Sequence, residues 1–187
     1  MQNNFGVGEG LIQSVSPYSA MRGAPGIEYI YRVNCGGQAA VDHEQQQWMA
    51  DTLSTHTAGS TQAKIQVGVA GKLMLAPAAD QPILQSYREG DKESTMGYRV
   101  PVEPFGSYCV EIYLQEPEAQ HPEERKFRMI INGHRSSWID LCQMTGRNTV
   151  IKLVFTVRPE ERDYIDIRFP KNEKGNAIVS AIAVGKL

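Results

Sequence analysis

The chain contains many residues that could do chemistry, but their spacing matches no catalytic motif. Histidine occurs four times, at His43, His56, His121 and His134. No two of them have close metal-ligand spacing, and none lies beside a Gly-x-Ser-x-Gly elbow. A glycosidase needs two carboxylates about 5–9.5 Å apart in a cleft, and none of the 21 acidic residues lies in a recognisable motif of that kind. We therefore expect no catalytic residue, no metal and no cofactor in this chain.

The cysteines give no sign of a disulfide framework or a zinc site. The chain has three cysteines, Cys35, Cys109 and Cys142. This number is odd, and their spacing is not the paired spacing of metal ligands. Cys109 lies in an apolar, strand-like run, where a free cysteine is most simply a small core residue.

Composition and charge exclude several classes of partner. The 187 residues include 19 basic and 21 acidic side chains, scattered along the chain, with a net charge of −2. The basic field that a phosphate backbone requires is missing, which argues against nucleic acid as a partner. The sequence has no apolar run of about 18 residues, so no membrane span is expected. Its first thirty residues also show no signal-peptide pattern.

The pattern of apolar residues predicts one all-β domain. Residues 1–26 are rich in Gly, Ser, Asn and Pro and are expected to form an irregular lead-in or linker before a domain at 27–187. The predicted strands are Glu28–Val33, Ile65–Val69, Lys72–Leu75, Gly97–Val102, Tyr108–Leu114, Phe127–Ile131, Val150–Val157, Tyr164–Phe169 and Ala177–Val184. Gln45–Leu53 could form one or two helical turns or a loop. Short strands with frequent turns favour a two-sheet antiparallel jelly-roll sandwich with few short helices.

Several segments together resemble the malectin-like domain. They are Tyr31–Gly37 with Val41–Asp42 and Trp48–Asp51, Gln85–Gly90 with Gly97–Val102, Gly106–Pro117, Lys126–Gly133, and the closing Asn176–Val184. The resemblance covers about residues 29–187 and implies a jelly roll. The Glu116-Pro117 pair and Trp48 make the sequence most similar to the C-terminal accessory domain of bacterial family-two glycoside hydrolases, the β-galactosidase and β-glucuronidase group.

This resemblance implies a non-catalytic, carbohydrate-binding accessory module of a glycoside hydrolase. The expected partner is a glycan, either an oligosaccharide or a polysaccharide, and the parent enzyme class implies a periplasmic or extracellular location. The alternative is a structural or interaction domain without sugar affinity. Such a domain would pack on a parent catalytic domain or mediate oligomer contacts. A fold does not decide between these functions, so the binding residues must be considered separately.

The aromatic residues of the family's sugar site are mostly missing from this sequence. A sugar-binding sandwich uses aromatic faces for the C–H side of a pyranose and carboxylates or amides for its hydroxyls. The resemblance places those aromatics on loops at one end of the domain, where this sequence has Glu89 and Glu118 instead. Relocated rings could restore the platform, and Trp48, Tyr87 and Tyr98 are the candidates.

Glu116 and Asn176 complete the set of candidate binding residues. Glu116 stands where the family has an acidic residue at a strand end, and Asn176 matches its asparagine before the last strand. Each candidate also has a structural alternative. Trp48 and Tyr98 could be core residues, Glu116 could belong to a solvated acidic loop, and Asn176 could cap a turn. Tyr87 lies in a polar segment and is expected to be exposed.

Overall fold

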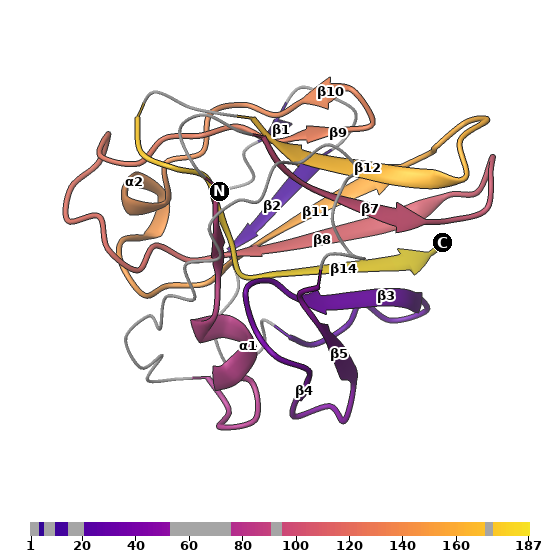
Figure 1. The fold of residues 1–187 in the computed structure, drawn as a ribbon, viewed down its shortest axis with the longest axis horizontal. Coiled ribbons are helices and arrows are strands. Elements are labelled where there is room, and N and C mark those ends of the chain that lie inside the picture. The colour runs from indigo at the N-terminus through magenta and orange to yellow at the C-terminus, as the bar shows by residue number, and fades with distance from the viewer. Residues whose placement is uncertain (1–3, 6–9, 15–20, 53–75, 91–94, 171–173) are drawn as a thin grey trace.

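The chain folds as a β-sandwich with a few short helices (Figure 1). The computed structural model describes residues 4–5, 10–14, 21–52, 76–90, 95–170 and 174–187. The large sheet has the strand order β1-β2-β11-β8-β14-β3-β5-β4, and two smaller sheets have the orders β10-β9-β12-β7 and β13-β6. The strands are β1 (Asn4–Phe5), β2 (Gly10–Ser14), β3 (Glu28–Asn34), β4 (Ala40–Val41), β5 (Gln47–Ala50), β6 (Arg88–Glu89), β7 (Met96–Pro101), β8 (Tyr108–Leu114), β9 (Ile130–Ile131), β10 (His134–Arg135), β11 (Ile151–Val157), β12 (Tyr164–Phe169), β13 (Ile178–Val179) and β14 (Ala181–Lys186). The helices are α1 (Gln81–Gln85) and α2 (Leu141–Thr145).

The main core lies between the large sheet and the four-stranded sheet. Side chains alternate between the two faces of a strand, so Ile165, Ile167 and Phe169 of β12 all point into this core. The Phe169 ring meets the Phe127 ring with a centroid distance of 6.4 Å. The predicted all-β sandwich is thereby confirmed.

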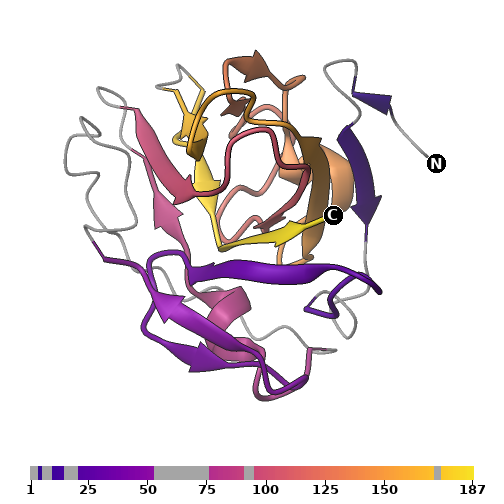
Figure 2. The same cartoon turned by 90° about the vertical axis from the view of Figure 1, so that its right-hand side faces the viewer.

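The outer face of the central strands of the large sheet is also covered, because α1 and the β4–β5 edge of the same sheet pack against it (Figure 2). Consequently every residue of β8 is buried, including Glu111. The Glu111 carboxylate accepts hydrogen bonds from Tyr29 Oη at 2.8 Å and Tyr113 Oη at 2.5 Å, and pairs with Lys152 Nζ at 3.4 Å. A buried charge is tolerated when it is paired and hydrogen-bonded in this way.

Several segments differ from the sequence prediction. The predicted strand Ala177–Val184 is divided into β13 and β14, which belong to different sheets, and only Ile130–Ile131 of the predicted strand Phe127–Ile131 is a strand. β2 lies within the expected lead-in and pairs with β11 of the large sheet, although the boundary at residue 26 stays a prediction. The Gln45–Leu53 segment contains the strand β5 rather than a helical turn, and β5 pairs in parallel with β3. This parallel pair is an exception to the expected antiparallel order. The predicted strands Ile65–Val69 and Lys72–Leu75 lie outside the described residues.

The predicted hairpin turn at Asn132-Gly133 joins β9 to β10. Asn132 has φ 48° and Gly133 has φ 88°, the left-handed conformations that this two-residue turn requires and that Asn-Gly adopts readily.

The part of the chain that the structure describes has no helix long and apolar enough to cross a bilayer. Cys109 is buried, as expected for a small core residue.

Ile167→Ala tests the position of the main core. Ile167 is fully buried, so the substitution should lower the free energy of unfolding by about 2–5 kcal/mol because it leaves a cavity. Urea unfolding followed by circular dichroism measures the loss. The exposed turn residue Glu161 provides the control, since Glu161→Ala should change stability by no more than about 0.5 kcal/mol. Equal effects of the two substitutions would contradict the packing described.

Candidate functional site

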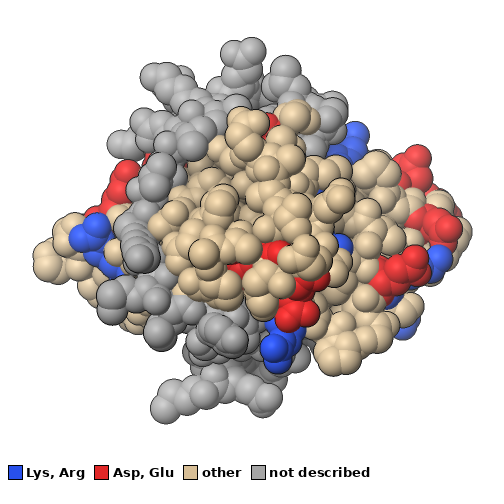
Figure 3. Space-filling model, turned by 90° about the horizontal axis from the view of Figure 1, so that it is seen from below, with Lys and Arg blue, Asp and Glu red and all other residues tan. Residues whose placement is uncertain are grey.

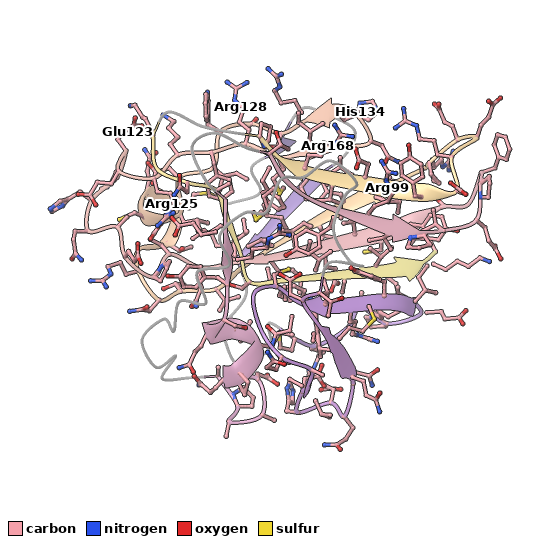
Figure 4. The ribbon with its side chains drawn as sticks, viewed as in Figure 1. Arg99, Glu123, Arg125, Arg128, His134 and Arg168 are labelled. Carbon is pink, nitrogen blue, oxygen red and sulfur yellow. The ribbon has the colours of Figure 1, made fainter. Side chains whose placement is uncertain are left out.

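Arg125 is the centre of a polar cluster at one end of the sandwich, at the left of Figure 4. Its Nε donates to Glu116 Oε2 at 2.9 Å, and its Nη1 donates to Glu89 Oε1 at 3.0 Å and to the Asn176 carbonyl oxygen at 2.7 Å. Its Nη2 lies 3.4 Å from Glu118 Oε2. One largely buried guanidinium therefore contacts three carboxylates. We call these five residues the Arg125 cluster.

Strand ends place the members of the cluster together. Glu89 belongs to β6, which pairs with β13 just after Asn176. Glu116 follows β8, and its acidic loop returns to the sheet at Arg125. Lys126 N donates to the Lys174 carbonyl oxygen at 2.9 Å and fixes that return. Residues distant in the sequence meet because their strands end at the same edge of the fold.

The Glu116 carboxylate is a structural anchor. It is fully buried, and its Oε1 accepts from the backbone N–H groups of Glu118 at 2.9 Å and Ala119 at 2.8 Å. Its other oxygen accepts from Arg125. With both oxygens occupied, Glu116 shapes the loop that carries Glu118. It is neither a solvated residue, as the alternative proposed, nor open to a ligand.

Glu118 is the open member of the cluster. Its side chain is 60% exposed, and its Oε1 accepts from Tyr87 Oη at 3.2 Å. This contact and the one to Arg125 are the longest in the cluster, so its oxygens remain available to other donors. A carboxylate held beside a guanidinium can bind a pair of hydroxyl groups.

Tyr87 contributes its hydroxyl to the cluster rather than its ring. The residue is 3% exposed, so the expectation that it is exposed is wrong. Its ring packs in the main core, and the hydroxyl reaches Glu118. Burial, together with the Glu118 charge, raises the pKa of the Tyr87 phenol to about 12. Tyr87 is therefore a neutral hydrogen-bond donor at physiological pH.

Asn176 binds two members of the cluster. Its Nδ2 donates to Glu89 Oε1 at 3.1 Å, and its backbone carbonyl accepts from Arg125. The preceding Gly175 has φ 67°, and a Cβ there would lie 2.9 Å from the Glu124 carbonyl oxygen. Glycine is thus required for the close approach of this turn to the acidic loop.

Trp48 and Tyr98 lie away from the cluster and are buried. Trp48 is 2% exposed, its Nε1 donates to Asp42 Oδ2 at 2.9 Å, and its ring meets Tyr113 edge to face. Tyr98 is fully buried and donates to Asp51 Oδ2 at 2.8 Å. Their expected role as relocated stacking platforms is corrected, because neither ring presents a face to solvent.

The structure thus brings together three of the five candidates, Tyr87, Glu116 and Asn176. Sequence reasoning missed Arg125, although its position gave a signal: it is the first basic residue after four glutamates between 116 and 124. Glu89 and Glu118 were noted only as replacements for aromatic residues. Their shared partner explains why carboxylates occupy both positions.

Comparison with known proteins shows the family of the chain. The model of the malectin domain family matches residues 29–185. The chain belongs to the malectin domain family. A search of curated protein sequences gave no match.

Solved structures with this fold come from plants and from a bacterium. The ANX1 ectodomain from Arabidopsis thaliana superposes with a TM-score of 0.67 at 15% identity, over 84% of this chain and 48% of that chain. The plant receptor-like kinase FER gives a TM-score of 0.69 at 14% identity, over 86% and 50%. Bacteroides uniformis β-glucuronidase 2 gives a TM-score of 0.65 at 23% identity, over 84% and 18%. The malectin-domain chain therefore spans about half the length of these plant proteins and a smaller part of the bacterial enzyme.

Arg125→Met tests whether the guanidinium holds the cluster together. The substitution leaves Glu89 and Glu116 buried without their cationic partner, so stability should fall by about 3–5 kcal/mol. Urea unfolding at neutral pH measures this. Arg147 lies at the same end but is exposed, and Arg147→Met should cost no more than about 1 kcal/mol. Comparable losses for the two variants would show that Arg125 has no special role.

Proposed function

We propose that this malectin domain is a non-catalytic, carbohydrate-binding accessory module of a glycoside hydrolase. The observation that carries the proposal is the convergence of Glu118, Asn176 and Arg125 at one end of the sandwich, with the Glu118 carboxylate open to solvent. The likeness to a bacterial β-glucuronidase, whose chain is much longer than the matched part, supports an enzyme as the parent. In that arrangement, the module would hold glycan near a separate catalytic domain.

Sugar hydroxyls are the groups that suit this site. A hydroxyl can donate to Glu118 while a neighbouring hydroxyl accepts from the Arg125 guanidinium. Glu89 and Glu116 fix the guanidinium in place beforehand, which reduces the ordering cost of binding. Each such hydrogen bond contributes only about 0.5–1.5 kcal/mol, since water competes for it. Without an aromatic face, the dissociation constant should be about 1 mM or weaker.

The arrangement of the carboxylates supports a binding role rather than catalysis. Glycoside hydrolysis uses one carboxyl as a proton donor and a second as a base or nucleophile. Here Glu89, Glu116 and Glu118 all contact the same guanidinium. The three carboxylates are therefore held around one cation, an arrangement that positions the guanidinium for binding.

Glu118→Gln tests the proposal. Titration calorimetry with plant, host and microbial oligosaccharides should identify a ligand, and the substitution should weaken its binding about tenfold through loss of one charge-assisted hydrogen bond. The melting temperature should stay nearly unchanged because Glu118 is exposed. Glu123→Gln is the matched control on the same loop, where Glu123 pairs with Lys126 and Lys174, and it should bind normally. Absence of binding to every glycan would refute the proposal.

A structural or interaction module is the second candidate function. It is favoured by one observation, namely that Trp48, Tyr87 and Tyr98 are all buried, so none of these rings can stack on a sugar. On this hypothesis the end of the sandwich packs on the parent catalytic domain. Deleting the domain from the parent would then lower the parent's stability, while the isolated domain would bind no sugar.

A further inference from the structure

Two arginines on the four-stranded sheet are stacked on aromatic rings. The guanidinium carbon of Arg128 lies 3.9 Å from the centroid of the Trp138 ring, and that of Arg99 lies 4.1 Å from the centroid of the Tyr164 ring. Such stacking is favourable for arginine, whose flat guanidinium matches the face of a ring. It also fixes the orientation of the guanidinium.

Strand register puts further arginines on this same outward face. Arg168 of β12 and Arg135 of β10 both lie opposite Ile130 of β9, and Arg99 of β7 lies opposite Asp166 of β12. These residues alternate with the buried ones, so they point away from the core. We call the outward side of this sheet, with Arg99, Arg128, Arg135, Arg168, Asp166, Tyr164 and Trp138, the arginine face.

The arginine face is separate from the Arg125 cluster. Arg99, Arg128 and Arg168 follow the four-stranded sheet at the upper side of Figure 4, whereas Arg125 lies at its left end. Seen from the opposite side of the molecule, where α1 and β4–β5 lie, the described surface is mostly uncharged, with basic residues in small separate groups (Figure 3).

The arginine face carries more cations than anions. The described residues that define the face include four guanidinium groups and one carboxylate, that of Asp166, which accepts from Arg168 Nε at 2.5 Å. Arg99 Nε and Arg128 Nε are buried atoms without a hydrogen-bond acceptor among the described residues, whereas the Arg135 and Arg168 residues are exposed. The excess of guanidinium groups over carboxylates, with Arg135 and Arg168 exposed, suits the face to an anionic partner.

We propose that the arginine face binds an acidic polysaccharide, one that carries carboxylate or sulfate groups. The arginine fork fits such groups bidentately, and the Trp138 side chain, which belongs to a residue that is 46% exposed, offers an apolar surface for a sugar ring. Strands about 4.8 Å apart place Arg135 and Arg168, two strands from one another, roughly 10 Å apart. This spacing suits an extended chain with repeated charges.

The size of the arginine face favours a sugar chain over a protein. Four strands of up to six residues cover a flat area roughly 15 by 20 Å. A stable protein interface needs about 800 Å² on each partner, well above this area. The proposal goes beyond the function proposed for the Arg125 cluster and does not depend on it.

Charged and neutral dextrans provide the test, because they share one backbone. Carboxymethyl-dextran and dextran sulfate should bind the chain in biolayer interferometry at low salt, and dextran should not. Arg128→Gln with Arg135→Gln should weaken binding of the charged polymers at least about tenfold. The control, Arg22→Gln with Arg158→Gln, removes the same charge from exposed positions outside the arginine face and should change affinity less than about threefold. Melting temperatures confirm that both double variants fold.

Three results would overturn the proposal. One is equal weakening in the two double variants, which would indicate attraction by net charge alone. Another is absence of binding to both charged dextrans. If a ten-glutamate peptide then bound through the same arginines, the partner would be an acidic protein instead of a polysaccharide. The third is loss of binding in Glu118→Gln, which would show that the polymer occupies the Arg125 cluster. Normal polymer binding by Glu118→Gln would support two separate surfaces.

Discussion

The contact of Arg125 with three carboxylates is the interaction on which this end of the molecule depends. A guanidinium in a largely buried position is costly unless its donors and its charge are matched. Glu116 and Glu89 meet that requirement from two sides, and Asn176 adds a carbonyl acceptor. The same contacts bring the end of β8, the β6–β13 pair and the acidic loop together. The Arg125 contacts therefore both stabilise this end of the fold and form the candidate site.

This arrangement also explains how a site can exist without the aromatic residues that the family resemblance led us to expect. The positions concerned hold Glu89 and Glu118, and both bind Arg125. A stacking platform has thus been replaced by an ion-paired polar cluster. For the proposed carbohydrate-binding role, this arrangement predicts recognition of sugar hydroxyls rather than of the C–H faces of a sugar. On the four-stranded sheet, the Tyr164 and Trp138 rings stack on the guanidinium groups of Arg99 and Arg128. That surface is therefore basic, unlike the Arg125 cluster.

Local patterns predicted much of the fold from the sequence. The strict alternation of Tyr164–Phe169 and the Asn132-Gly133 turn are local signals, and both were read correctly. β5 was missed because Trp48 and Met49 adjoin polar residues in a way that a helical turn also allows. β2 was missed because Gly-rich and Ser-rich surroundings gave no strand signal, and its place is set by pairing with the distant β11.

The candidate site was harder to predict, because its geometry depends on contacts between distant segments. Tyr87 and Glu116 were identified, but the sequence could not show that both are buried. Arg125 looked like one more charge beside a solvated loop, since its partners Glu89 and Asn176 are 36 and 51 residues away. Burial of Trp48 and Tyr98 likewise follows from which sheet face each side chain meets, and that is decided by tertiary packing.

Nuclear magnetic resonance would test the central claim most directly, by following the Arg125 Nε–H signal and the backbone amides during addition of an oligosaccharide that binds. We predict shifts at Arg125 Nε–H and at the amides of Glu118, Ala119 and Asn176, with little change along β7 and β12. Shifts confined to other surfaces, with the Arg125 signal unmoved at saturation, would contradict the account.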